Sequence, residues 1–305
     1  FILQKSLIRD QFLENFLYKI IKEILLTCLS ENKSQLKEFY DFILSYAEQS
    51  FFNEYVFYQS DEEINLINKL KSKIEKSKEI NELEISILAC YMPLIKSNII
   101  KDKLLNYLPK NKLFSDLIKA QIKDNLEEQK LKSTIKSNVI VDEISKKVRD
   151  QYEENPYPRW KYAEIHPKVN FSSELNSDIH PNKISLFSEI KDYKILIAGC
   201  GTGQQLARVI NYRDADILAV DLSLSSLAFA KRKMQEFNIK NIEFLHTDLL
   251  KLKKLRKKFN IVECMGVLHH LENPEEGLNI LLDMLEPNGF LKLGLYSELA
   301  RKHIV

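Results

Sequence analysis

Apolar residues recur with a helical period through the first 150 residues of the chain. One set, spaced mostly three or four positions apart, would line a single helix face: Leu36, Phe39, Tyr40, Ile43, Ala47, Phe51 and Tyr55. Ser60 followed by Glu63 has the capping-box pattern and predicts the start of another helix. A third set predicts a further amphipathic helix: Val141, Ile144, Val148 and Tyr152. Residues 1–150 are therefore predicted to form an all-helical domain.

The pattern changes at residues 151–160, which have the sequence QYEENPYPRW. Pro156 and Pro158 lack the amide that a helix uses, and they favour extended conformations in the residues before them. Residues 151–192 are therefore predicted to be an extended linker or a lid. Two interpretations of its side chains stay open: they anchor the linker on the second domain, or they face a substrate. These side chains are Tyr157, Arg159 and Trp160, the last being the only tryptophan.

Strands and helices are predicted to alternate from residue 193 onwards. Short apolar runs that indicate strands occupy residues 193–198, 216–220, 242–245, 260–263 and 290–296. Helices are indicated at 204–210, by the stripe Leu227, Ala230, Met234 and Phe237, and after Asn273, with a turn at 286–289. This alternation predicts an α/β fold with a doubly wound, mostly parallel, Rossmann-like sheet over residues 193–305.

The amino-acid composition supports the same division into a helical and an α/β domain, and it argues against nucleic acid and membranes as partners. Residues 1–198 contain no glycine, which favours helices there, and all seven glycines lie between Gly199 and Gly294. With 45% hydrophobic and 29% charged residues, the net charge is only +2, so no overall field attracts nucleic acid or a membrane. The basic run KLKKLRKKF at 251–259 is interpreted as a solvated helix face.

Localisation is predicted from what the sequence lacks. There is no signal-peptide core, and no apolar run approaches the ~20 residues that a membrane span needs. The cysteines at 28, 90, 200 and 264 form no CxxC pair, which is typical of free thiols in a reducing compartment. We therefore expect a cytoplasmic protein without a nucleic-acid or membrane partner.

The loop after the first predicted strand carries the strongest chemical signal. In KILIAGCGTGQQ, residues 194–205, glycines at alternating positions let a ligand approach the backbone at the carboxyl edge of the sheet. The dinucleotide pattern G-x-G-x-x-G needs a third glycine where Gln204 stands, which disfavours the alternative of an NAD(P)-dependent oxidoreductase. Asp221 and Asp248 come at the ends of the next two strands.

Taken in order, the glycine loop, the two aspartates and FNIVECMGVLHHL resemble the class I S-adenosylmethionine-dependent methyltransferases over roughly residues 193–297. The resemblance implies S-adenosylmethionine as cofactor and methyl transfer by in-line displacement. Ile197 stands where many members carry an acid, which leaves the methionine amine to backbone carbonyls and water. The implied cofactor contacts are Gly199, Cys200, Gly201, Thr202 and Gly203 at the methionine and ribose, Asp221 at the ribose diol, Leu222, Asp248 and Leu249 around the adenine, and Glu263, Cys264 and Met265 beneath the methionine.

Catalysis of such a transfer depends mainly on orientation, which supplies ~7–11 kcal/mol, whereas a general base contributes ~10²–10⁴-fold. His269 and His270 are the candidate bases, because imidazole titrates near neutral pH. The alternative is that one of them packs and the other hydrogen-bonds the loop. His246 is predicted to be structural. No metal is expected, because the histidine pair and Glu272 lack a third ligand at a suitable spacing.

A closer resemblance covers most of the chain. NEYVFYQSDEEI, YMPL, VRDQYEENPYPRW and ILIAGCGTGQ together resemble bacterial methyltransferases associated with tetratricopeptide repeats. The resemblance implies a repeat array before Phe1, and the seven strands usual in the family imply two more strands beyond residue 305. The acceptor is expected to be a small molecule, or a protein presented by the helical domain. A scaffold that binds the cofactor without turnover is the remaining alternative.

Overall fold

The structure is a computed structural model of the whole chain. It describes residues 2–5, 8, 10–30, 33–138, 150, 152–154, 156–163, 171–183, 193–209, 215–297, 299 and 302. The chain divides into two compact units, Phe1–Glu127 with Pro158–Tyr162, and Glu128–Tyr157 with Ala163–Val305. The chain therefore passes from one unit to the other three times. The domain boundaries predicted at residues 150 and 192 stay predictions.

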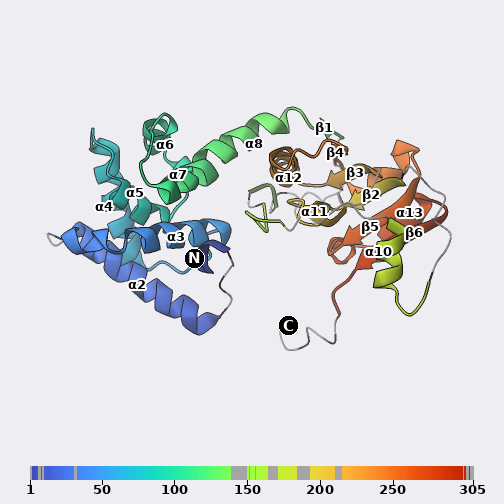
Figure 1. Cartoon of the computed structure of the whole chain (residues 1–305), viewed down its shortest axis with the longest axis horizontal. Coiled ribbons are helices and arrows are strands. Elements are labelled where there is room, and N and C mark those ends of the chain that lie inside the picture. Colours follow the sequence, from blue (N-terminus) through green and yellow to red (C-terminus); the bar gives the residue numbers. More distant parts are fainter. Residues whose placement is uncertain are drawn as a thin grey trace. The chain divides into compact units, whose positions relative to one another are not determined.

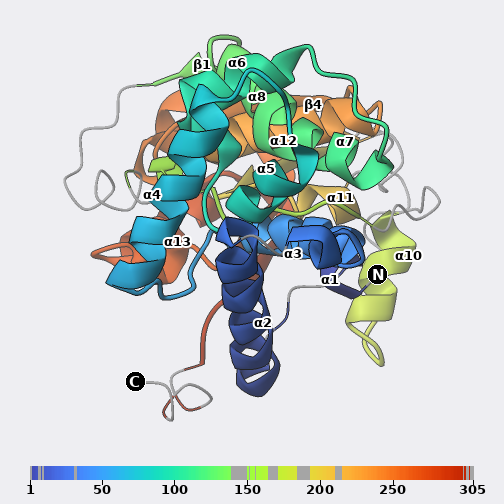
Figure 2. The same ribbon diagram turned by 90° about the vertical axis from the view of Figure 1, so that its left-hand side faces the viewer.

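The first unit is helical, and Figures 1 and 2 show its helices from two directions. Its core consists of side chains with no exposed surface, among them Ile43, Leu70, Leu88 and Phe114. Its elements are α1 (Ile2–Lys5), α2 (Gln11–Leu29), η1 (Lys33–Lys37), α3 (Tyr40–Phe52), α4 (Asp61–Lys76), α5 (Glu82–Ala89), η2 (Leu94–Lys96), α6 (Asn98–Leu105), α7 (Lys112–Ile118), η3 (Lys119–Lys123) and the first residues of α8 (Asp124–Lys132).

The helix boundaries predicted from the sequence agree only in part with those observed in this unit. The capping box is confirmed, because the Glu63 amide donates to Ser60 Oγ at 3.3 Å and the Ser60 amide donates to Glu63 Oε2 at 3.1 Å. The helical set that runs to Tyr55 extends too far: α3 ends at Phe52, because Glu54 and Tyr55 adopt positive φ of 53° and 55°. Leu36 belongs to the separate turn η1. Val141, Ile144 and Val148 lie outside the described residues.

The second unit is built on a six-stranded parallel sheet with the order β1-β4-β3-β2-β5-β6 (Figure 1). Its other elements include the end of α8 and the helix α10 (Phe171–Asp178). In chain order the rest are β1 (Lys136–Ser137), β2 (Tyr193–Ala198), α11 (Leu206–Val209), β3 (Ala215–Asp221), α12 (Leu224–Glu236), β4 (Ile242–His246), η4 (Leu249–Leu255), β5 (Phe259–Met265), η5 (Leu268–His270), α13 (Pro274–Asp283) and β6 (Leu285–Gly294).

The strand order confirms the predicted doubly wound fold. From β2 the chain adds β3 and β4 on one side, and then β5 and β6 on the other. The direction of winding therefore reverses between β2 and β5, and a ligand crevice is expected at the carboxyl ends of these two strands. Residues 195–198 of β2 and 217–220 of β3 are fully or almost fully buried, which is why they form continuous apolar runs in the sequence.

Three local expectations need correction in the second unit. β1 falls within the residues predicted to be all-helical, because two residues are too few to show an alternating pattern. The helix α10 interrupts the segment predicted to be extended, where the sequence FSSELNSD contains neither proline nor glycine. The turn at 286–289 lies inside β6, where the pairing shifts from Phe259↔Leu285 to Ile261↔Phe290.

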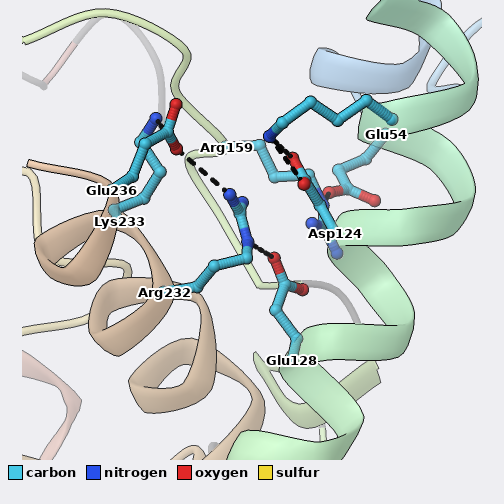
Figure 3. Close-up of polar contacts among 8 residues, drawn as sticks. Glu54, Asp124, Glu128, Arg159, Arg232, Lys233 and Glu236 are labelled. Atoms are coloured by element: carbon cyan, nitrogen blue, oxygen red, sulfur yellow. Dashed lines mark hydrogen bonds and ion pairs between the residues drawn. The ribbon is translucent and has the colours of Figure 1, made fainter.

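A buried ion pair joins the last turns of α8 to α12 (Figure 3). Arg232 Nε donates to Glu128 Oε1 at 2.9 Å, and both side chains are only 7% exposed. Arg232 also lies 3.3 Å from the more exposed Glu236, through Nη1. This pair fixes α12, whose first residues border the ligand crevice.

We predict that Glu128→Gln lowers the free energy of unfolding by about 3 kcal/mol, because it leaves the buried guanidinium without its buried counter-charge. Urea unfolding followed by circular dichroism measures this loss. The matched control is Glu243→Gln, which removes an exposed carboxylate paired with Lys136 and should cost less than about 1 kcal/mol. Equal losses in the two variants would contradict the prediction.

Candidate active site

The loop after β2 is held in a conformation that requires glycine. Gly199, Gly201 and Gly203 have φ of +77°, +52° and +82°. A Cβ on Gly199 would lie 2.2 Å from Val267 Cγ2, and one on Gly203 would lie 2.8 Å from Ala230 Cβ. A Cβ on Gly201 would meet nothing within 4 Å. Two of the glycines are therefore required by packing, and the third presents bare backbone to an open space.

Asp221 at the end of β3 holds this loop in place. Its Oδ2 accepts a hydrogen bond from the Gly201 amide at 2.7 Å, and its Oδ1 accepts one from the Ser223 amide at 2.9 Å. Burial raises the pKa of Asp221, and these backbone hydrogen bonds oppose the rise. The carboxylate therefore lies beside the glycine loop with lone pairs left for a ligand.

The neighbouring strand end is fixed through a histidine. His246 Nε2 lies 2.9 Å from the Leu222 carbonyl oxygen, and His246 Nδ1 lies 2.6 Å from Ser137 Oγ. Both ring nitrogens of His246 therefore have protein partners, which agrees with the structural role predicted for this residue.

Asp248 follows β4 and carries an unsatisfied oxygen. Its Oδ1 accepts from the Leu250 amide at 2.9 Å and so caps η4. Its side chain is 1% exposed, and its Oδ2 has no hydrogen-bond partner among the described residues. A buried carboxylate oxygen without a donor is costly, so a ligand that donates a hydrogen bond fits this position. Leu249, next to it, is buried and apolar.

A carboxylate also lies on the other side of β2. Glu263 on β5 pairs in register with Ile197, is only 4% exposed, and accepts a hydrogen bond at its Oε2 from Gln205 Nε2 at 2.7 Å. Its neighbour Cys264 is buried, and burial raises the pKa of the thiol to about 12, so this cysteine is not a nucleophile near neutral pH. Met265 at the strand end is partly exposed. The acid missing at position 197 therefore has a counterpart on the adjacent strand.

The two histidines lie together after β5 in an aromatic group. The ring centroids of His269 and His270 are 4.2 Å apart, and His269 lies 4.3 Å from the ring of Tyr296. His270 is exposed and meets the Tyr152 ring edge-on at 6.4 Å. The structure thus brings together the two predicted bases, and it adds Tyr152 and Tyr296, which the sequence analysis did not assign to a site.

Tyr152 and Glu153 are fixed to the start of α12. The carboxylate of Glu153 accepts from the Ser225 amide at 2.9 Å and pairs with Lys132 Nζ at 2.7 Å. Ser223 Oγ donates to the Tyr152 carbonyl at 3.0 Å, and Ser225 Oγ donates to the Glu153 carbonyl at 2.8 Å. Tyr152 was expected in a helix, and residues 152–154 are helical in the structure. The hydrogen bonds of this segment connect it to the carboxyl edge of the sheet.

Glu153 makes a pH-dependent contribution to stability. Burial alone would raise its pKa, but hydrogen bonds from Lys132 and Ser225 lower the pKa from 4.5 to about 2. A carboxylate with a lowered pKa stabilises the fold fully above its unfolded value and loses that contribution as the pH falls through its folded value. The difference in urea midpoint between the chain and Glu153→Gln should therefore be largest near pH 7 and shrink between about pH 4.5 and pH 2. A difference independent of pH would contradict this.

The three candidate substrate residues of the linker differ in their exposure and in their contacts. Arg159 is 9% exposed and donates through Nε to Glu54 Oε1 at 2.9 Å, with its guanidinium 5.1 Å from the Phe51 ring centroid (Figure 3). These contacts lie within the first unit, and the expectation that Arg159 anchors the linker on the second domain stays a prediction. Trp160 is buried and Tyr157 is exposed. The substrate role of the three residues stays a prediction.

Comparison with known proteins places this site in a family. A family model described as a methyltransferase domain matches residues 195–289, which include the glycine loop, both aspartates and the two histidines. Residues 195–289 form a methyltransferase domain. This match agrees with the sequence resemblance to the class I S-adenosylmethionine-dependent methyltransferases.

Several relatives resemble the methyltransferase domain. The chain is 37% identical over 113 residues to an uncharacterised protein of Synechococcus sp., covering 36% of this chain and 27% of that protein. It is 34% identical over 109 residues to the mitochondrial ubiquinone biosynthesis O-methyltransferase of Schizosaccharomyces pombe, covering 34% of this chain and 38% of the enzyme. The structure of PKMT2 from Rickettsia typhi in complex with AdoHcy is 29% identical, covers 33% of this chain and 20% of that one, and gives a TM-score of 0.31.

Each alignment covers only a part of the relative's own length. The chain spans well under two thirds of the length of the relatives described above.

In the part of the chain that the structure describes, no helix is both long enough and apolar enough to cross a membrane.

Proposed function

We propose that the protein transfers a methyl group from S-adenosylmethionine to a nucleophilic atom of a small-molecule or protein acceptor. One observation supports this most strongly. A bare glycine loop, held by Asp221 at the reversal point of the sheet, lies in the same series of strand ends as Asp248, whose buried Oδ2 has no partner among the described residues. The polar groups that the structure leaves open suit the donors of S-adenosylmethionine.

In this proposal, different residues contact the ribose, the adenine and the methionine part of the cofactor. Asp221 would accept hydrogen bonds from the ribose hydroxyls, and the backbone of residues 199–203 would lie against the ribose and methionine. Asp248 would accept from the adenine amino group, with Leu222 and Leu249 against the ring. Glu263 would face the methionine ammonium, because it supplies a buried carboxylate beside Ile197. This assignment replaces the expectation that backbone carbonyls and water alone meet the amine.

When bound, S-adenosylmethionine supplies a methyl group already activated by the sulfonium, so the protein's task is orientation. The side chains at the carboxyl edge exclude water and align the acceptor. His270 is the exposed member of the histidine pair, and it would take the acceptor's proton at a ring nitrogen, with His269 packed against it.

Calorimetric titration tests the cofactor assignment. The whole chain is titrated with S-adenosylhomocysteine and, separately, with NAD. We expect binding of S-adenosylhomocysteine and no binding of NAD. Binding of NAD instead would overturn the proposal. A transfer assay with labelled S-adenosylmethionine over small-molecule and protein acceptors then separates an enzyme from a scaffold that binds without turnover.

The finer assignment rests on the sequence motifs. The segments quoted above support a bacterial methyltransferase associated with tetratricopeptide repeats, and the cysteine pattern supports a cytoplasmic location. Tyr157, Arg159 and Trp160 are proposed as acceptor-side residues, of which Tyr157 has the largest exposed surface. A transfer assay comparing Tyr157→Ala with the unchanged chain tests this role.

A further inference from the structure

We infer that the short helical segment of residues 152–154 is a wall of the active site, with Tyr152 in contact with the bound cofactor and Glu153 as its positioning residue. The inference rests on the proposed function, because it assigns a residue to the same crevice. It adds to the site a segment that lies outside the matched residues 195–289.

Tyr152 lies near the ends of two strands. Its ring meets His270, which follows β5. The Tyr152 carbonyl accepts a hydrogen bond from Ser223 Oγ at 3.0 Å, and Ser223 lies two residues after the end of β3. Burial raises the pKa of Tyr152, and Tyr296 and Asp221 raise it further. These strand ends flank β2, and the glycine loop follows β2. Tyr152 therefore stands beside the crevice in which the cofactor is proposed to bind.

The side chain of Tyr152 is partly accessible to a ligand. The residue is half-buried in the described structure. A half-buried tyrosine offers an apolar ring and a polar tip to the same ligand. The ribose, the methionine part or the acceptor would meet this surface.

Glu153 sets the position of Tyr152 through α12. The helix is capped twice: Ser223 Oγ accepts from the Ser226 amide at 3.0 Å, and the Glu153 carboxylate accepts from the Ser225 amide. A carboxylate at a helix N-terminus is favoured by the helix dipole as well as by the hydrogen bond. Because Ser223 lies two residues after Asp221, the cap joins the helical segment 152–154 to the same strand end that holds the glycine loop.

The test measures binding of S-adenosylhomocysteine by calorimetry in the whole chain. We expect Tyr152→Ala to weaken binding about 10-fold, because it removes an aromatic wall. Glu153→Ala should weaken it several-fold, and Glu153→Gln should restore most of the loss, since the amide oxygen can still accept from Ser225. Glu243→Gln and Tyr58→Ala are controls at exposed side chains.

A double-mutant cycle separates positioning from a general structural effect. If Glu153 acts through Tyr152, the Tyr152→Ala Glu153→Ala variant binds no more weakly than Tyr152→Ala alone. Additive losses would overturn the positioning role. Unchanged affinity in Tyr152→Ala, while the unchanged chain binds S-adenosylhomocysteine, would overturn the whole inference. Absence of binding in the unchanged chain would instead count against the proposed function, on which the inference rests.

Discussion

Replacing Asp221 by alanine is expected to weaken the binding of S-adenosylhomocysteine by about 100-fold. Hydrogen bonds to a charged group contribute ~1.5–3 kcal/mol each, and 1.4 kcal/mol corresponds to tenfold in affinity. The variant also releases the Gly201 amide, which Asp221 Oδ2 holds at 2.7 Å, so the loop loses part of its preorganisation. Calorimetric titration of the whole chain measures the change.

Asp221→Asn separates lost binding from lost folding. Burial raises the pKa of Asp221, so its ionised form costs stability above the unfolded pKa. At neutral pH asparagine removes this cost, but its single acceptor oxygen can keep only one of the two backbone hydrogen bonds. The melting temperature of the free chain should therefore fall less than in Asp221→Ala, while binding still weakens. Glu243→Gln controls for the loss of one carboxylate elsewhere. Full affinity in Asp221→Asn and Asp221→Ala would remove the ribose contact from the proposal.

The second large effect is a contrast between two glycines of one loop. Gly199→Ala should lower the free energy of unfolding by about 3 kcal/mol, because φ of +77° is strained for alanine and its Cβ would lie 2.2 Å from Val267 Cγ2. Gly201→Ala should cost only about 1 kcal/mol, since its Cβ meets no protein atom within 4 Å. Urea unfolding measures both.

Ligand binding, in contrast to stability, should be sensitive to the substitution at Gly201. In Gly201→Ala the added methyl group occupies the open space against which the cofactor is proposed to lie, so the affinity for S-adenosylhomocysteine should fall by at least about 10-fold in a chain that remains folded. If Gly201→Ala binds normally, the open space is not the cofactor site. The comparison thus tests whether the loop faces the ligand at Gly201 in particular.

Much of the second unit could be predicted from sequence because its signals are local. Parallel strands buried on both faces leave continuous apolar runs, so β2 and β3 were predicted almost to the residue. The helix start at Asn273 is confirmed, because its Oδ1 accepts from the Glu275 and Glu276 amides at 3.1 and 3.2 Å. Caps and buried strands are set by neighbouring residues, which a single sequence displays.

The missed parts depend on contacts between distant residues. The cap that Glu153 gives to Ser225 joins positions 72 residues apart, and nothing in the local sequence around either residue indicates the other. The same holds for Glu263, whose importance follows from its register opposite Ile197. The sequence suggests that Arg159 contacts a substrate or the second domain, but it does not indicate the hydrogen bond to Glu54, 105 residues away. Such pairings are fixed by tertiary structure.

The second unit consists of two separate segments of the chain, Glu128–Tyr157 and Ala163–Val305. This division determines where a fragment or chimaera that contains the methyltransferase domain has to begin. A fragment that starts at residue 193 would lack β1 beside β4, the Glu128 partner of Arg232 and the Glu153 cap of α12. A fragment that starts at Glu128 carries all three, together with the short excursion of Pro158–Tyr162. Chimaeras that exchange the helical unit for another module therefore need their junction before Glu128, some 65 residues upstream of the glycine-loop strand.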